Sequence, residues 1–139
     1  MRQGRATWAE LGQLLGLSAP SAADRVRKLE EAQVITGYAA LLDPTAVGYP
    51  LTAFIFVTLA NSRSRAAFLR AIAKMEQVSE CHHIAGDDDY LLKVRCRTTA
   101  DLDHLLAKEL KDKLGVARTR TTIVLATAKE SVQIPIAED

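Results

Sequence analysis

The hydrophobic pattern of the chain changes period, from helical repeats in the first third to strand-like alternation after residue 50. Near the start, Thr7 and Glu10 have the spacing of a capping box, which predicts the beginning of a helix. Gly16 is suited to end that helix, because glycine accepts the left-handed conformation of a C-terminal cap. The apolar stripe predicted between these ends consists of Trp8, Leu11, Leu14 and Leu15.

A second helix is predicted to begin at Ser18, with Pro20 in its first turn, and to run to about Gln33. Its predicted buried stripe is Ala22, Val26 and Leu29. Two helices joined by residues 16–18 have the spacing of a helix-turn-helix, whose second helix enters the major groove of DNA. The candidate contacts to double-stranded DNA are Ser18, Ser21, Arg25, Arg27 and Lys28. The alternative is a plain helical hairpin with a solvated charged face.

Residues 34–42 are predicted to form a short strand and connector. Pro44, Gly48 and Pro50 cluster just after it, and such residues favour turns and linkers. We therefore expect a helix-turn-helix domain over residues 1–42, a linker over 43–50 and a second domain over 51–139.

The second domain has the predicted order strand, helix, strand, strand, helix, strand. With right-handed crossovers this order gives a ferredoxin-like βαββαβ fold, one four-stranded antiparallel sheet with both helices on one face, so the fold class is α+β. The predicted strands cover residues 51–60, 78–85, 90–96 and 116–128. The first helix should cover 66–75, and the second should begin after the Thr98 cap and end at Gly115. The side chains expected to face the sheet are Phe68, Leu69, Ile72, Met75, Leu102, Leu105, Leu106 and Leu110.

The strand over residues 51–60 is largely apolar on both faces, since Ile55 and Val57 alternate with Phe54 and Phe56. Two helices can cover only one face of the sheet. We therefore expect a partner subunit on the other face.

The hairpin over residues 78–96 carries the most distinctive chemistry. Its arms are joined by Gly86, Asp87, Asp88 and Asp89, residue types that favour turns. Three adjacent carboxylates repel one another unless a ligand neutralises them or water solvates them, and a solvated turn is the alternative to a binding site.

Cys81 and Cys96 lie on the two arms and would face each other if the turn centred between Asp88 and Asp89, but the sequence does not fix the register; a reducing cytosol favours two free thiols. His82 and His83 beside the acidic turn raise the alternative of a metal site. Adjacent strand residues point to opposite faces, and the spacing fits no zinc template, so we expect no metal.

Composition sets the remaining limits. The chain has 139 residues, of which 48% are hydrophobic and 25% charged, with a net charge of +1. A DNA contact must therefore come from a local basic cluster. No apolar run approaches the roughly 20 residues of a membrane span, and no signal-peptide core is present, so we expect a cytoplasmic protein. A small ferredoxin-like enzyme or a stand-alone ligand-binding module is the alternative, but the inward positions are nearly all aliphatic and we expect no enzyme and no cofactor.

The motifs together resemble the Lrp/AsnC family of transcriptional regulators over nearly the whole chain. The N-terminal motifs are GLS at 16–18, RVRKLEE at 25–31, VITGY at 34–38 and LDP at 42–44. The C-terminal motifs, which resemble the regulatory (RAM) domain of that family, are VSECH at 78–82, GDDDYLLKV at 86–94 and GVARTRT at 115–121.

This resemblance implies a homodimer whose sheets pack face to face, often assembled further to an octamer. It also implies a small effector, commonly an amino acid, bound around the hairpin turn, so that effector binding changes the assembly and the display of the DNA-binding helices. The residues that the resemblance assigns to the effector are His83, Gly86, Asp87, Asp88, Asp89, Tyr90 and Thr121. Turn amides can bind a carboxylate, and an Asp can pair with an α-ammonium.

The chain departs from the family pattern at three places. Family members usually begin with a further helix, and without it we expect incomplete cover of Leu11, Leu14, Val26 and Leu29. Gln33 stands where a glycine usually ends the recognition helix, which places a non-glycine residue at positive φ. Ala22 replaces a larger aliphatic residue and thins the same core.

Overall fold

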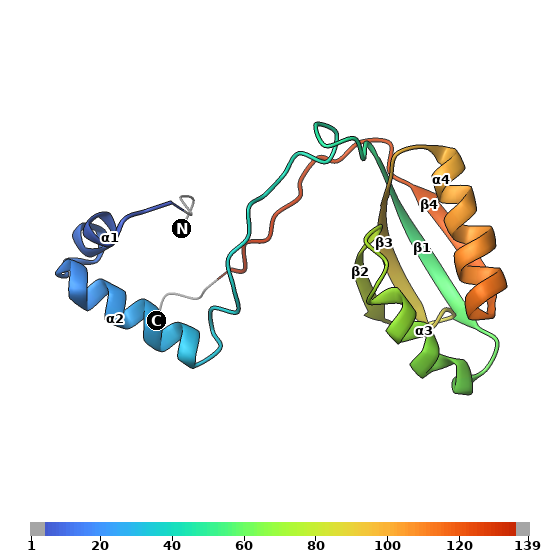
Figure 1. The fold of residues 1–139 in the computed structure, drawn as a ribbon, viewed down its shortest axis with the longest axis horizontal. Coiled ribbons are helices and arrows are strands. Elements are labelled where there is room, and N and C mark those ends of the chain that lie inside the picture. The colour runs from blue at the N-terminus through green and yellow to red at the C-terminus, as the bar shows by residue number, and fades with distance from the viewer. Residues whose placement is uncertain (1–4, 136–139) are drawn as a thin grey trace. The chain divides into compact units, whose positions relative to one another are not determined.

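A computed structural model of the chain describes residues 5–135. Its contacts divide the chain into two compact units, Met1–Leu41 and Leu42–Asp139, which we describe separately (Figure 1). No helix in the part of the chain that the structure describes is long and apolar enough to cross a membrane.

The first unit consists of helices α1 (Trp8–Leu15) and α2 (Ala19–Glu31). The predicted capping box is confirmed, because the Glu10 amide donates to Thr7 Oγ1 at 3.3 Å and the Thr7 amide donates to the Glu10 carboxylate at 2.7 Å. Ser18 caps α2 by accepting a hydrogen bond from the amide of Ser21 at 3.3 Å. The turn between the helices is therefore followed directly by a capped helix start, as the sequence predicts.

Burial in the first unit is confined to the contact between the two helices. Leu11 and Ala22 are buried there, and the close approach needs Gly12, since a Cβ at that position would lie 2.6 Å from the carbonyl oxygen of Leu17. The prediction that the other residues of the two apolar stripes are buried is wrong, because each helix covers only the side of the other that faces it. The large apolar residues left exposed on them are Trp8, Leu14, Leu15 and Leu29. The incomplete cover predicted for Leu14, Val26 and Leu29 is thereby confirmed, since Val26 is half-buried, whereas the same prediction for Leu11 is wrong because α2 covers it.

The C-terminus of α2 is followed by a non-glycine residue in the left-handed region. Gln33 has φ 56°, as predicted from the absence of glycine there. The amides of Val34 and Ile35 donate back to the carbonyl of Leu29 at 2.9 and 3.1 Å. The predicted strand over residues 34–42 is wrong: these residues form none, because a strand needs a hydrogen-bonded neighbour and no other segment of the described chain pairs with them.

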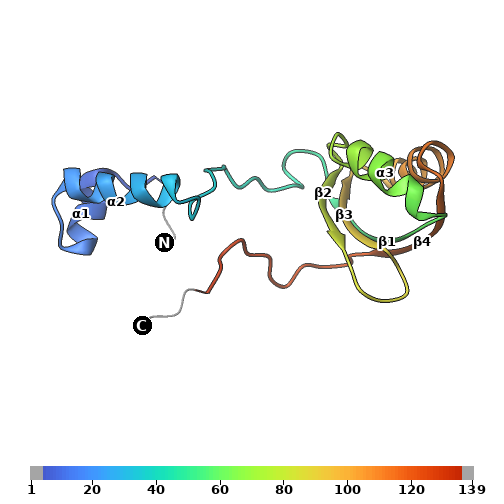
Figure 2. The ribbon, with the colours of Figure 1, turned by 90° about the horizontal axis from the view of Figure 1, so that it is seen from below.

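The second unit is the predicted ferredoxin-like fold, a four-stranded antiparallel sheet in the order β2-β3-β1-β4. Figure 2 shows both helices on the same face of the sheet. The strands are β1 (Leu51–Leu59), β2 (Val78–His83), β3 (Tyr90–Cys96) and β4 (Val116–Ile123). The helical elements are the 3₁₀ turn η1 (Ser62–Ser64), α3 (Arg65–Ile72), and α4 (Thr99–His104), which continues as the π-helical η2 (Leu105–Lys113).

The core lies between the sheet and the helices. Ala53, Ile55 and Val57 point into it from β1, and Phe68 and Leu105 close it from the helices. The second capping box is confirmed, since the Asp101 amide donates to Thr98 Oγ1 at 3.1 Å. Leu69 is an exception to the predicted inward set: it is 38% exposed, because α3 ends at Ile72 and turns only its Phe68 and Ile72 side fully to the sheet.

The opposite side of the sheet is not covered by α3, α4 or η2, and we call it the open face. It carries Phe54 and Phe56 of β1, and Leu91, which pairs with Phe56 and so points the same way. All three are half-buried. The predicted division of β1 into two apolar faces is therefore confirmed.

Two details of the sheet differ from expectation. The last strand ends at Ile123, not at residue 128: the Val124 amide still donates to Thr52 at 2.9 Å, but β1 begins at Leu51 and offers nothing further to pair with. Cys81 lies opposite Leu92, so the turn is not centred between Asp88 and Asp89, and the condition under which Cys81 and Cys96 would face each other is not met; both are free thiols.

Candidate functional site

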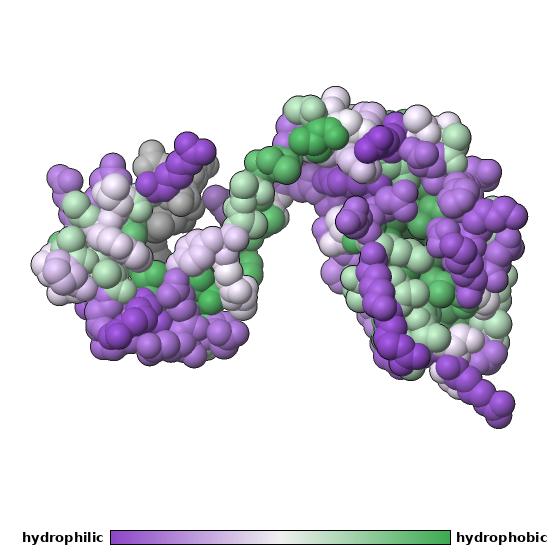
Figure 3. Space-filling view, viewed as in Figure 1, coloured by the Kyte–Doolittle hydropathy of each residue, from purple (hydrophilic) through white to green (hydrophobic). Residues whose placement is uncertain are grey.

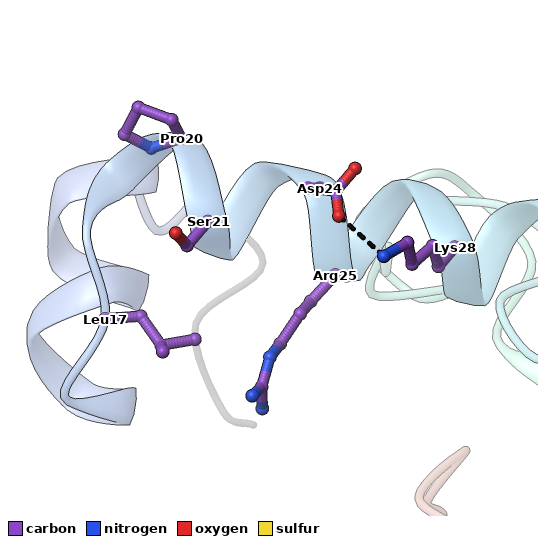
Figure 4. A pocket seen from close by; sticks show the side chains of 6 residues that line it. All are labelled: Leu17, Pro20, Ser21, Asp24, Arg25 and Lys28. Atoms are coloured by element: carbon purple, nitrogen blue, oxygen red, sulfur yellow. Dashed lines mark ion pairs between the residues drawn. The ribbon is translucent and has the colours of Figure 1, made fainter.

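The first candidate surface is the exposed side of α2. Ser21, Arg25 and Lys28 lie about one helical turn apart, which places them on one side of α2. In Figure 4, Arg25 extends away from the helix, whereas Lys28 reaches along it to Asp24. Together with the preceding turn they border a shallow cavity of about 480 Å³. Its lining residues are Leu17, Pro20, Ser21, Asp24, Arg25 and Lys28.

The three basic residues of α2 differ in how far they are neutralised. Asp24 forms ion pairs with Lys28 at 2.9 Å and with Arg27 at 2.5 Å. The hydrogen bonds from Lys28 and then Arg27 lower the pKa of Asp24 below its ordinary value. Arg25 has no ion-pair partner among residues 5–135, and its side chain extends away from the helix (Figure 4). Arg25 is thus the basic group of this surface most available to another molecule.

The second candidate surface is the β2–β3 turn, where the three adjacent carboxylates have different surroundings. Asp88 is 6% exposed and accepts a hydrogen bond from the Thr58 hydroxyl at 2.9 Å. Asp89 accepts a hydrogen bond from the amide of Leu59 at 2.8 Å. Asp87 is exposed, and its carboxylate has no hydrogen bond or ion pair within the described part of the chain. Two of the three charges are therefore already used in holding the turn against β1.

Two arginines of β4, which the sequence reasoning missed, neutralise the buried carboxylate. Arg118 and Arg120 lie 3.3 and 3.1 Å from the two oxygens of Asp88. The hydrogen bonds from Arg120 and then Thr58 hold the pKa of Asp88 below its ordinary value. The sequence did indicate that these two arginines lie together. Residues 118 and 120 are two positions apart in the last predicted strand, so their side chains share one face of the sheet. What the sequence did not indicate is that this face meets the acidic turn.

These charged residues line one cavity of about 470 Å³ on the second unit, formed by Asp87, Asp88, Arg118 and Arg120. This volume is within the range of about 300–1,000 Å³ that is usual for small-molecule sites. The side chains of Arg118 and Arg120 remain 63% exposed although Asp88 anchors their guanidinium groups. The cavity therefore offers fixed charges of both signs.

The other residues predicted to bind an effector are not brought to this cavity. Tyr90 is buried on the helix side of the sheet, with its ring centroid 5.1 Å from that of Phe68 and 5.2 Å from that of His83. Thr121 pairs with Ile55 and so points to the same helix-covered side, away from Arg120. Gly86 lies in the turn itself with φ 148°, a conformation that favours glycine.

The open face also carries a network of charges around Lys93. Its ammonium group pairs with Glu80 at 3.1 Å and with Glu130, and these carboxylates raise the pKa of Lys93. Glu130 also pairs with Arg95 at 3.0 Å, which ties the segment after β4 to β3. These contacts surround the apolar centre of the open face with polar groups.

Two known protein families match the chain, one within each of its two units. Residues 1–30 match the AsnC-type helix-turn-helix domain. Residues 52–134 match the Lrp/AsnC ligand binding domain.

Individual relatives agree with this match. The leucine-responsive regulatory protein of Escherichia coli (strain K12) is 36% identical over 137 residues, which are 97% of this chain and 84% of that protein. The protein of the same name from Haemophilus influenzae is 36% identical over 132 residues, covering 94% and 80%.

Solved structures give the same picture in three dimensions. A transcriptional regulator of Neisseria meningitidis in complex with L-methionine has a TM-score of 0.90 at 31% identity, covering 95% of this chain and 86% of that one. A feast or famine regulatory protein of M. tuberculosis complexed with L-methionine has a TM-score of 0.83 at 35% identity, covering 95% and 88%. These proteins are regulators and not enzymes, which speaks against the alternative of a small dimeric enzyme. With both domains matched in order, the chain belongs to the Lrp/AsnC family of transcriptional regulators.

Proposed function

We propose that this regulator binds double-stranded DNA through α2 and that an amino acid bound at the β2–β3 turn changes its assembly and its DNA affinity. The observation that carries this proposal is the presence, in one chain, of a recognition helix whose Arg25 has no ion-pair partner among residues 5–135 and a ligand-binding domain with a cavity of both charges. The helix-turn-helix domain then covers residues 1–42, the linker 43–50 and the effector domain 51–139.

For the DNA side, Arg25 and Ser21 lie early enough on α2 to reach base edges in the major groove. We assign contacts with the phosphate backbone to Ser18 at the N-cap and to Arg27 and Lys28 further along α2. Arg27 and Lys28 must exchange Asp24 for a phosphate, so we assign them a smaller share of the affinity.

For the effector side, the support is the charged cavity at the turn together with the two structural neighbours that hold L-methionine. Turn amides at residues 86–88 and the free carboxylate of Asp87 are the groups that we assign to a zwitterion, since the Asp89 amide already donates to the carbonyl of Val57. Of the other predicted contacts, His83 is exposed beside the turn, whereas Tyr90 and Thr121 lie on the helix side of the sheet, outside the charged cavity.

For assembly, we propose that the open face is a homodimer interface and that dimers associate further, to an octamer. Its apolar centre of Phe54, Phe56 and Leu91 within a charged rim has the anatomy of a protein interface. The residues around the boundary of the two units are also apolar and exposed, namely Tyr38, Leu41, Leu42 and Val47, and we propose them as a second surface for association. Figure 3 shows apolar surface along this part of the chain. We also assign this regulator to the cytoplasm, where we expect its DNA target.

A mobility-shift titration on the DNA upstream of the chain's own gene tests the proposal. We expect a discrete complex whose affinity falls steeply as salt rises, because binding releases counterions from the phosphates. We also expect the shift to change when an amino acid that binds the protein is added. Equal retention of unrelated DNA of the same length, at every salt concentration, would contradict sequence-specific binding.

A further inference from the structure

The three carboxylates at the β2–β3 turn differ in whether they already have hydrogen-bond or ion-pair partners. Both oxygens of Asp88 have partners, one near Thr58 and Arg118 and the other near Arg120. Asp89 is committed to the amide of Leu59. Only Asp87 keeps a carboxylate that no side chain or amide of residues 5–135 contacts. A cationic group entering the cavity therefore finds one available acceptor, not three.

Arg118 and Arg120 are held in place by Asp88, but each keeps hydrogen-bond donors that have no acceptor in the described part of the chain. Each guanidinium contacts Asp88 through a single nitrogen, Nη2. Arg120 is held further by stacking over the ring of Phe56, with its Cζ 4.0 Å from the ring centroid. The Nε–H and Nη1 donors of both residues have no acceptor within the described part of the chain. Such a donor fork matches the geometry of a carboxylate.

The cavity thus combines two oriented donors for an anion with one acceptor for a cation, all bordering about 470 Å³. A ligand with only a negative charge would meet Asp87, and a ligand with only a positive charge would meet two guanidiniums. A small zwitterion that carries a carboxylate and an ammonium group satisfies both sets.

We propose that Arg118 and Arg120 bind the carboxylate of an α-amino acid effector and that Asp87 binds its ammonium group. This inference rests on the proposed function and adds to it the residues that recognise the charged end of the ligand. The sequence assigned all three aspartates of the turn to the effector. Here Asp88 orients the two arginines and is not available to the ligand.

Isothermal titration calorimetry of the full chain against each of the twenty protein amino acids tests this. Every amino acid that binds the wild type is then titrated into Arg118→Gln, Arg120→Gln and Asp87→Asn. Arg70→Gln, on the exposed side of α3 and outside the cavity, is the matched control. We expect each cavity variant to bind about tenfold more weakly or worse, since each loses a charge-assisted hydrogen bond, and Arg70→Gln to bind as the wild type does.

Ligand analogues on the unmodified protein keep the test independent of how the variants fold. The methyl ester of the bound amino acid lacks the anionic carboxylate, and its N-acetyl derivative lacks the ammonium group. We expect both to bind at least about tenfold more weakly than the parent compound.

The outcomes separate the inference from the proposed function. An amino acid that binds the wild type and the cavity variants equally, or binds no more tightly than its methyl ester, overturns the assignment of the arginines and leaves the effector function intact. If none of the twenty binds the wild type, the amino acid effector itself is overturned, and this inference with it.

Discussion

The carboxylate of Asp88 and the guanidinium of Arg120 form an ion pair of 3.1 Å that ties the β2–β3 turn to β4. β4 is the edge strand on the far side of β1, so this contact spans β1 through Thr58 and closes one end of the open face. The turn is therefore held in place by the chain itself before any ligand binds.

The pH dependence of stability reports on this contact. Because Arg120, Thr58 and Arg118 hold the pKa of Asp88 below its ordinary value of 3.8, the contact stabilises the fold above pH 3.8. This contribution is lost as the pH falls below 3.8 through the lowered pKa. We expect Asp88→Asn to unfold at lower urea concentration than the wild type at pH 7, with the difference shrinking as the pH is lowered below 3.8. Asp87→Asn is the matched control and should change neither midpoint, whereas an Asp88→Asn deficit of equal size at both pH values would contradict the role of the charge.

Arg25 should dominate sequence recognition. Replacing it by alanine removes the one basic side chain of α2 without an intrahelical partner in the described chain, and we expect a loss of about 1–3 kcal/mol of binding to the specific site. Arg27→Ala is the matched control, with a smaller loss, because Arg27 already pairs with Asp24 and Glu31. Fluorescence anisotropy with labelled DNA measures both. A larger effect for Arg27→Ala would reverse our assignment.

Asp24 should limit non-specific DNA binding. Its carboxylate neutralises Arg27 and Lys28, so Asp24→Asn frees two cations on the helix that we assign to DNA. We expect tighter binding to unrelated DNA and a steeper plot of log affinity against log salt, by about one unit for each additional phosphate that a freed cation neutralises. Titrations between low and moderate salt measure the slope, and an unchanged slope would show that these ion pairs persist on DNA.

Phe56 should hold the proposed dimer together. It lies at the centre of the open face, under the guanidinium of Arg120. Phe56→Asp places a charge in that interface, and we expect dissociation to monomers in sedimentation velocity runs at micromolar concentration. Leu125→Asp provides the control, since Leu125 is fully exposed beyond β4. Identical sedimentation of the wild type and Phe56→Asp would place the interface elsewhere.

Gln33 should cost the first unit some stability. It occupies the left-handed region at φ 56° just after α2, where glycine has no Cβ penalty. We expect Gln33→Gly to stabilise the helical unit by roughly 1 kcal/mol. Thermal unfolding followed by far-UV circular dichroism tests this. Gly37→Ala, at a position without positive φ, should have little effect.

Much of the fold could be predicted from the sequence because its determinants are local. The capping boxes at Thr7 and Thr98 involve residues three apart, and the alternation along β1 follows from the pleat of a single strand. The order of strands and helices then leaves few topologies. These features depend on neighbouring residues or on general rules of chain connection.

The errors concern contacts between distant segments. Arg118 and Arg120 lie about 30 residues further along the chain than Asp88, and the register that separates Cys81 from Cys96 depends on the length of the turn. Residues 34–42 have the composition of a strand, but strand formation depends on a neighbour that the pattern of one segment does not specify. The acidic turn was therefore located correctly while its ion pairs with β4 were missed.

The central claim is that an amino acid at the β2–β3 turn alters what α2 binds, and DNA affinity measured with and without the ligand tests it most directly. Labelled DNA from upstream of the chain's own gene is titrated with the full chain, alone and with a saturating amino acid that calorimetry shows to bind. We predict that the two apparent Kd values differ by about fivefold or more, and that Asp87→Asn abolishes the difference. Superimposable binding curves, with the amino acid demonstrably bound, would contradict the account.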